Sequence, residues 1–141
     1  MPKPKPTIDS ITSRFLSKIA IVGDCWVWCG GKYPNGYGRL AWSHNSVLAH
    51  IASYTLLVGE IPPGMEIDHT CKNVICVSPD HLEPVTSQEN VRRSDSPCGR
   101  NARKTHCHRG HEFTNDNTYW IRGRRRDCLA CRRLRKEMRH R

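Results

Sequence analysis

Two thiols and an imidazole in the middle of the chain have the spacing of a zinc-binding loop. Cys71 and Cys76 are five positions apart, and His81 follows five positions later. Structural zinc sites use four nitrogen or sulfur ligands in a tetrahedron, so a fourth ligand must come from elsewhere. Cys25 is the preferred candidate and Cys29 the alternative, since both would lie on one face of a short strand. The pattern predicts a small domain whose fold depends on a structural Zn²⁺ ion.

A second set of four ligands lies near the C-terminal end. Cys107 and His111 form a C-x3-H pair, and Cys128 and Cys131 form a C-x2-C pair after sixteen intervening residues. His108 competes with His111, but the chain would have to fold back too tightly for Cys107 and His108 to share one ion. This spacing predicts a second structural Zn²⁺ ion.

Asp68, His69 and Asn90 add groups that a structural zinc site does not need. Mg²⁺ prefers oxygen ligands, which the Asp68 carboxylate and the Asn90 amide can supply. An imidazole has a pKa near neutrality and can take a proton from water at physiological pH. We therefore predict a catalytic Mg²⁺ (or Mn²⁺) held by Asp68 and Asn90, with His69 as the general base.

Residues 24–94 contain a series of motifs around these groups. They are Cys25-Trp26-Val27-Trp28, Gly36-Tyr37-Gly38, Ala49-His50, Ser53-Tyr54, Gly59-Glu60-Ile61-Pro62, Asp68-His69-Thr70-Cys71, Cys76-Val77-Ser78-Pro79-Asp80-His81-Leu82-Glu83 and Glu89-Asn90. With these motifs the segment resembles the HNH endonucleases, or ββα-metal nucleases. The nearest branch carries zinc and includes the His-Cys box homing endonucleases and small phage HNH proteins.

The resemblance implies a role for each matching residue. His69 would activate water, Asn90 and Asp68 would bind the catalytic divalent ion, and His81 would be a zinc ligand. The sequence departs from the family pattern at Ser78, where the family often has Asn, and at Ile51, where it often has Arg. Because Ile51 replaces the family's arginine, the identity of the arginine that contacts phosphate is open, and Arg39 is a candidate. The module around Cys107 also resembles a tail found beside phage HNH domains.

Charge is distributed unevenly along the chain. Residues 1–91 carry 7 Lys/Arg and 8 Asp/Glu, a net charge of −1, whereas residues 92–141 carry 16 and 5, a net charge of +11. A basic half of this density is typical of proteins that bind nucleic acid through phosphates. The candidate DNA-binding residues are Arg39, Arg92, Arg93, Arg124, Arg125, Arg126, Arg132, Arg133 and Arg135.

These features together predict an α+β protein with a small ββα-metal (HNH) core and a C-terminal zinc-binding basic module. The expected organisation is an N-terminal arm and short helix (1–23), the nuclease domain (24–94), a polar linker (95–105) and the basic module (106–141). The expected elements are helices at about 9–20, 50–58, 86–94 and 132–139, strands at 25–29, 37–42, 65–69 and 82–85, and a hairpin around Gly123.

The function that we predict from the sequence is a metal-dependent DNA endonuclease with two structural zinc ions. Its expected partner is double-stranded DNA, and its expected state is a monomer or homodimer. No apolar segment predicts a signal peptide or a membrane span, so we expect a cytoplasmic protein. A phage-encoded protein in the cytoplasm of its host cell fits this expectation. The alternatives are a non-catalytic zinc-finger DNA-binding protein and an RNA- or ribosome-associated zinc protein.

Overall fold

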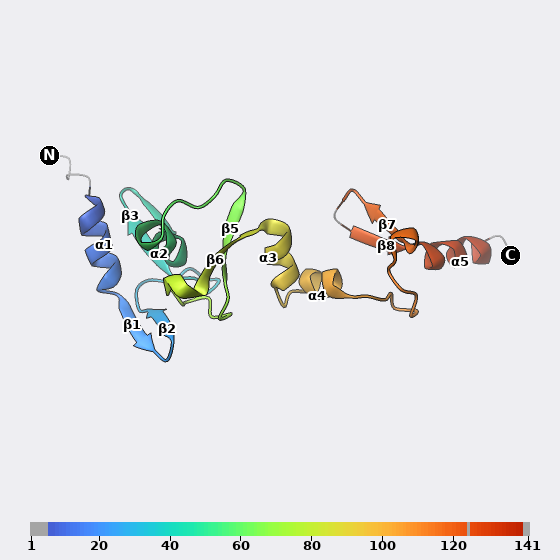
Figure 1. Ribbon diagram of the computed structural model, residues 1–141, viewed down its shortest axis with the longest axis horizontal. Helices are drawn as coiled ribbons and strands as arrows, with labels where there is room; N and C mark the ends of the chain where they lie inside the picture. The colour runs from blue at the N-terminus through green and yellow to red at the C-terminus, as the bar shows by residue number, and fades with distance from the viewer. Residues whose placement is uncertain (1–5, 124, 140–141) are drawn as a thin grey trace. The chain divides into compact units, whose positions relative to one another are not determined.

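The fold is α+β, as predicted, and it divides into two compact units, Met1–Asn90 and Val91–Arg141. The structure is a computed structural model that describes residues 6–123 and 125–139 (Figure 1). Arg124, one of the predicted DNA-binding residues, lies outside the described residues. The two units are considered separately below.

The strands of the first unit are short and pair as antiparallel hairpins. The pairs are β1 (Ile19–Val22) with β2 (Cys25–Trp28), β3 (Arg39–Trp42) with β4 (Asn45–Leu48), and β5 (Met65–His69) with β6 (Leu82–Thr86). The helices between and around them are α1 (Ile8–Leu16), α2 (Ala49–Leu57), the short 3-10 helix η1 (Pro79–His81) and α3 (Ser87–Arg93). Strands this short have little stability alone, so they depend on packing against the rest of the unit.

The first helix is shorter than predicted. Thr7 caps α1 by accepting a hydrogen bond from the backbone N–H of Ser10, and the helix ends at Leu16 instead of near residue 20. Ile19, which we expected on the helix, begins β1 and pairs with Trp28. The apolar residues at positions 19, 21 and 22 favour a strand because β2 lies within reach through a tight turn at Gly23, which has φ +59°.

The core of the first unit forms where α1, α2 and β2 meet. Phe15 and Trp28 are fully buried and stack with ring centroids 5.5 Å apart. Around them lie the other buried members of the cluster, which are Ile11, Leu40, Ala49, Ala52 and Val77. Trp26 and Trp42 pack against this cluster, so these tryptophans contribute to the core. Gly38 allows the close packing, since a Cβ there would lie 2.6 Å from the Trp28 ring.

The predicted strand–loop–strand–helix sequence at the end of the first unit is confirmed. Strand β5 has the expected bounds, the loop after it leads into η1, and β6 returns beside β5 with His69 opposite Leu82. Thr86 accepts a hydrogen bond from the backbone N–H of Glu89 and so caps α3. This is the ββα arrangement expected from the sequence, with His69 on a strand and Asn90 on the following helix.

The second unit contains a helix inside the segment that we expected to be a polar linker. Helix α4 (Pro97–Arg103) begins after Ser96, whose hydroxyl accepts a hydrogen bond from the backbone N–H of Gly99. The expected hairpin is confirmed as β7 (Thr118–Ile121) and β8 (Arg125–Cys128), preceded by the 3-10 helix η2 (Asn115–Asn117) and followed by the basic helix α5 (Leu129–Arg139). Across the described residues, every helix is too short or too polar to cross a membrane.

Candidate metal centres and active site

The first predicted zinc cluster is assembled in the structure. The ligand atoms of Cys25, Cys71, Cys76 and His81 all lie within 4.8 Å of one another. The Nδ1 atom of His81 is 3.7 Å from the Cys25 sulfur and 3.5 Å from the Cys76 sulfur. Three sulfur atoms and one nitrogen at these separations match a closed tetrahedral zinc site. Burial raises the pKa of the Cys76 thiol to about 11, so its thiolate form depends on a bound cation.

Backbone pairing decides which upstream cysteine joins this cluster. Strand β2 lies along residues 75–77, with Trp28 N donating to Ile75 O at 2.9 Å and Val77 N donating to Trp26 O at 2.7 Å. This pairing places Cys25 beside the loop. Cys29 lies beyond the end of β2, is exposed, and has its sulfur against the Val27 carbonyl at 3.6 Å. The structure therefore favours Cys25, the preferred candidate.

The second predicted cluster is also assembled, with His111 and not His108 as its histidine. The ligand atoms of Cys107, His111, Cys128 and Cys131 lie within 4.8 Å of one another. His111 Nδ1 is 3.3 Å from the Cys131 sulfur and 3.5 Å from the Cys107 sulfur. A turn at Gly110, with φ +81°, brings Cys107 and His111 together. The two clusters can each hold one zinc ion.

Asn117 supports the second cluster and was not predicted. Its Nδ2 donates to the Cys128 sulfur at 3.5 Å, and its Oδ1 accepts from the backbone N–H of Ala130 at 2.9 Å. Such a residue holds a ligand in position without binding the metal itself. Nothing in the spacing of the ligands points to it, because it approaches from a separate turn of the chain.

His69 lies at the end of β5 and is buried, with 5 % of its surface exposed. Its Nε2 is 3.1 Å from the carbonyl oxygen of Cys76. A carbonyl oxygen only accepts, so Nε2 carries the proton and Nδ1 is the basic nitrogen. Burial lowers the pKa of His69 below its usual value, although the hydrogen bond to Cys76 and the charge of Asp68 oppose this effect. The imidazole is therefore neutral near pH 7, as a general base must be.

Asp68 and Asn90 are brought to the same face of β5. Asp68 accepts a hydrogen bond from the backbone N–H of His69 through Oδ1, at 2.8 Å. Because side chains alternate along a strand, Asp68 shares a face with Glu66, whereas His69 leaves the opposite face. The Nδ2 atom of Asn90 donates to Glu66 Oε2 at 2.6 Å. The Asp68 carboxylate and the Asn90 amide each offer oxygen as a potential metal ligand, which suits Mg²⁺ or Mn²⁺.

His50 is the neighbour of His69 that sequence reasoning missed. It lies on α2 and is 4 % exposed, and its ring centroid is 4.6 Å from that of His69 in an edge-on arrangement. Tyr37 packs against both rings, at 5.5 Å from His50 and 6.1 Å from His69. Burial, and then the proximity of His69, lowers the pKa of His50 from 6.5 to about 4. In the sequence, His50 is marked only by its place in the Ala49-His50 motif of the HNH resemblance.

Comparison with known proteins agrees with this geometry. Residues 47–92 match a family model described as HNH endonuclease. This match confirms the resemblance. Residues 47–92, called the HNH segment below, include His50, His69 and Asn90 and three ligands of the first cluster.

Two curated relatives come from Escherichia phage T7. "Protein 2.8" is 28 % identical over 81 residues, which are 57 % of this chain and 56 % of the relative. "Protein 7.7" is 34 % identical over 67 residues, which are 48 % of this chain and 52 % of the relative. The chain thus spans about half the length of the curated relatives it matches. No solved structure matches the chain.

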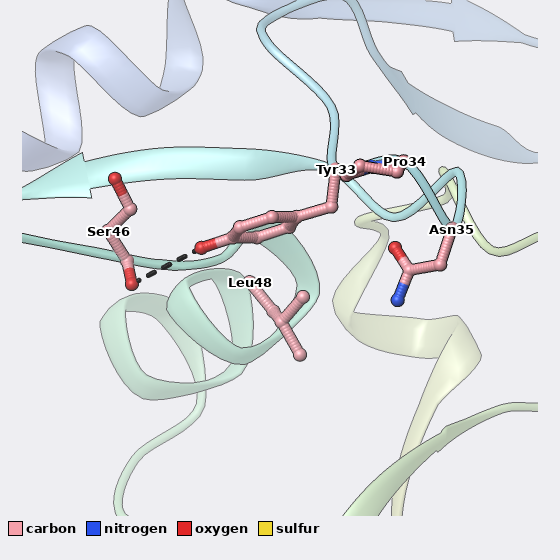
Figure 2. Close-up of a pocket in the computed structure, with 5 residues that line it drawn as sticks. All are labelled: Tyr33, Pro34, Asn35, Ser46 and Leu48. Carbon is pink, nitrogen blue, oxygen red and sulfur yellow. Dashed lines mark hydrogen bonds between the residues drawn. The ribbon is translucent and has the colours of Figure 1, made fainter.

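A surface pocket lies between the loop at Tyr33 and strand β4, and Leu48 of the HNH segment lines it. Figure 2 shows Tyr33 reaching across it, with its hydroxyl donating to the carbonyl of Ser46 at 3.4 Å. Arg39, the candidate phosphate contact, is exposed on β3 and has its guanidinium 5.9 Å from the centre of the Tyr33 ring. Its charge is accessible on the surface next to this pocket.

The predicted DNA-binding arginines of the second unit differ in their surroundings. Arg126 stacks on the Phe113 ring at 4.1 Å and donates to the carbonyls of Asn101 and Lys104, so it holds the unit together. Arg135 pairs with Asp127 at 3.1 Å, and Arg132 lies over the Tyr119 ring at 4.9 Å. Arg93 and Arg126 are half-buried, whereas the other described arginines of this set are exposed, namely Arg92, Arg125, Arg132, Arg133 and Arg135.

Proposed function

We propose that this protein is a metal-dependent endonuclease that hydrolyses phosphodiester bonds in double-stranded DNA. The match of residues 47–92 to the HNH endonucleases supports a nuclease and implies a nucleic acid substrate. The single observation that carries the mechanism is the hydrogen bond from His69 Nε2 to the Cys76 carbonyl, because it leaves Nδ1 as a neutral proton acceptor.

In the proposed reaction His69 Nδ1 takes a proton from a water molecule. The water oxygen attacks the phosphorus, and the bond from phosphorus to the 3′ oxygen breaks. Asp68 and Asn90 hold Mg²⁺ or Mn²⁺, which when bound stabilises negative charge on the phosphate and on the leaving oxygen. Cys76 connects the proposed zinc site with the proposed general base. Its sulfur belongs to the first cluster, and its carbonyl oxygen orients His69.

We propose that the basic second unit binds DNA through phosphates. The net charge of +11 over residues 92–141 would make this binding strongly dependent on salt. Arg92, Arg93, Arg125, Arg132 and Arg133 are the proposed contacts, together with Arg39 in the first unit. The protein would act as a monomer or homodimer, and its phage relatives support a role in the host cytoplasm.

The test is cleavage of supercoiled plasmid by the purified, zinc-loaded protein. Mg²⁺ is added or omitted from chelator-treated buffer, because EDTA would also remove zinc. The wild type should cut only with Mg²⁺ or Mn²⁺, and His69→Ala should lose cutting by at least about a hundredfold, as expected for loss of a general base. His44→Ala is the matched control, since His44 is exposed on a turn in the same unit.

Zinc content, thermal melting and DNA affinity are measured for both variants, so that unfolding is not mistaken for loss of chemistry. Normal cutting by folded His69→Ala would refute its role as the base. Tight DNA binding by a wild type that never cuts with either ion would favour the non-catalytic zinc-finger alternative.

A further inference from the structure

Glu66 contacts Asn90 through the one atom of the amide that cannot bind a metal ion. The Nδ2 atom of Asn90 donates to Glu66 Oε2 at 2.6 Å. A carboxylate only accepts, so the amide cannot turn over without facing Oδ1 against a negative charge. Since Nδ2 and Oδ1 diverge from one carbon, holding Nδ2 also determines where Oδ1 points.

Other carboxylates lie on the face of β5 that carries Glu66. Glu66 and Asp68 lie on the same face of β5, and Glu83 stands opposite Asp68 across the ladder. Glu66 Oε2 thus faces the donor end of the Asn90 amide and leaves its carbonyl oxygen for another partner. A residue that orients a metal ligand commonly changes metal affinity by 10- to 100-fold when it is replaced.

We propose that Glu66 is a positioning residue that turns the Asn90 carbonyl oxygen toward the divalent ion. The proposal rests on the proposed function, in which Asn90 is a ligand, and it adds a residue that neither the zinc spacing nor the Asp68-His69 pair identified. Glu66 acts through Asn90 and does not itself bind the ion. Replacing it should therefore weaken metal binding only as long as Asn90 is present.

The experiment measures Mn²⁺ binding by electron paramagnetic resonance, without DNA, in zinc-loaded protein. Glu66→Gln keeps the shape of the side chain but offers both a donor and an acceptor, so either orientation of Asn90 becomes possible. We expect about tenfold weaker Mn²⁺ binding in Glu66→Gln, with Asn90→Ala at least as weak. Glu60→Gln is the matched control, because it removes the same charge from an exposed position of the same unit.

The double variant Glu66→Gln/Asn90→Ala decides between positioning and direct ligation. If Glu66 acts through Asn90, the double variant binds Mn²⁺ as Asn90→Ala does. Additive losses would show that Glu66 binds the ion directly and would overturn the proposal, as would unchanged affinity in Glu66→Gln. A further outcome is that the wild type binds Mn²⁺ and the variants show the expected losses, while the protein cuts no DNA. That outcome would refute the proposed nuclease function and leave the positioning role of Glu66 intact.

Discussion

Replacing His50 with phenylalanine should make the first unit less sensitive to acid. His50 is buried against His69 and Tyr37, and its Nδ1 has no hydrogen-bond partner among the described residues. Burial is the main reason that its pKa is lowered from 6.5 to about 4. In the unfolded chain the imidazole takes up a proton near its ordinary pKa, so acid favours the unfolded state.

The sign and size of the effect follow from the two pKa values. Above pH 6.5 the imidazole is neutral in both states and has no effect on the pH dependence. As the pH falls from 6.5 to about 4, each pH unit removes about 1.4 kcal/mol of unfolding free energy. The loss attributable to His50 should reach about 2 kcal/mol at pH 5 and about 3 kcal/mol below pH 4. Phenylalanine has no proton to gain, so the variant should lack this loss.

The assay is urea denaturation between pH 7.5 and 5 with zinc in excess, followed by tryptophan fluorescence. Three of the four tryptophans, Trp26, Trp28 and Trp42, lie in the first unit. The two proteins differ only at position 50, so the comparison isolates the effect of replacing His50. The larger ring adds a penalty of about 1–3 kcal/mol that does not depend on pH. If the two stability curves run parallel between pH 7 and 5, His50 does not titrate as its burial requires, and the reasoning is wrong.

Three further predictions concern the zinc clusters and the arginines. Cys25→Ser should lower the zinc content from two ions to one per chain, whereas Cys29→Ser should keep two, as measured by mass spectrometry; equal zinc contents would contradict the assignment. Cys131→Ser should remove the second ion and leave the melting transition of the first unit unchanged, because the two clusters share no ligand. Arg126→Ala should destabilise the second unit by about 1–3 kcal/mol in thermal melts. Arg133→Ala should instead weaken DNA binding at low salt without changing the melt, and the reverse pattern would contradict their assigned roles.

Much of the site could be predicted because metal ligands are spaced along the chain by short turns. The C-x3-H and C-x2-C pairs identified all four residues of the second cluster before any fold was known. The expected strand carrying Asp68 and His69 has the bounds that its composition indicated. The roles of Asp68, His69 and Asn90 remain predictions, and the hydrogen bond between Glu66 and Asn90 joins helix α3 to strand β5.

Where two local patterns compete, the sequence predicted the secondary structure less well. Ile19 continues the apolar period of α1 but also starts a strand, and the nearby β2 decides in favour of the strand. The polar composition of residues 95–105 predicted a linker where the structure has the capped helix α4. Ser96 and Pro97 are common in turns as well as at the start of helices, so their presence did not distinguish the two. In both cases the local signal was real, and a neighbouring segment or a cap determined the outcome.

The sequence by itself determined that this protein has two sets of Cys/His residues that can hold metal ions, that its second half is strongly basic, and that an HNH-like segment surrounds the first set. These properties depend on residue types and on spacings of a few positions, which local chain geometry constrains. Only the tertiary structure decided that Cys25 joins the cluster, that His50 lies beside His69, and that Glu66 holds Asn90. Those contacts join residues 19 to 56 positions apart, and packing between separate elements determines them, so no local pattern encodes them.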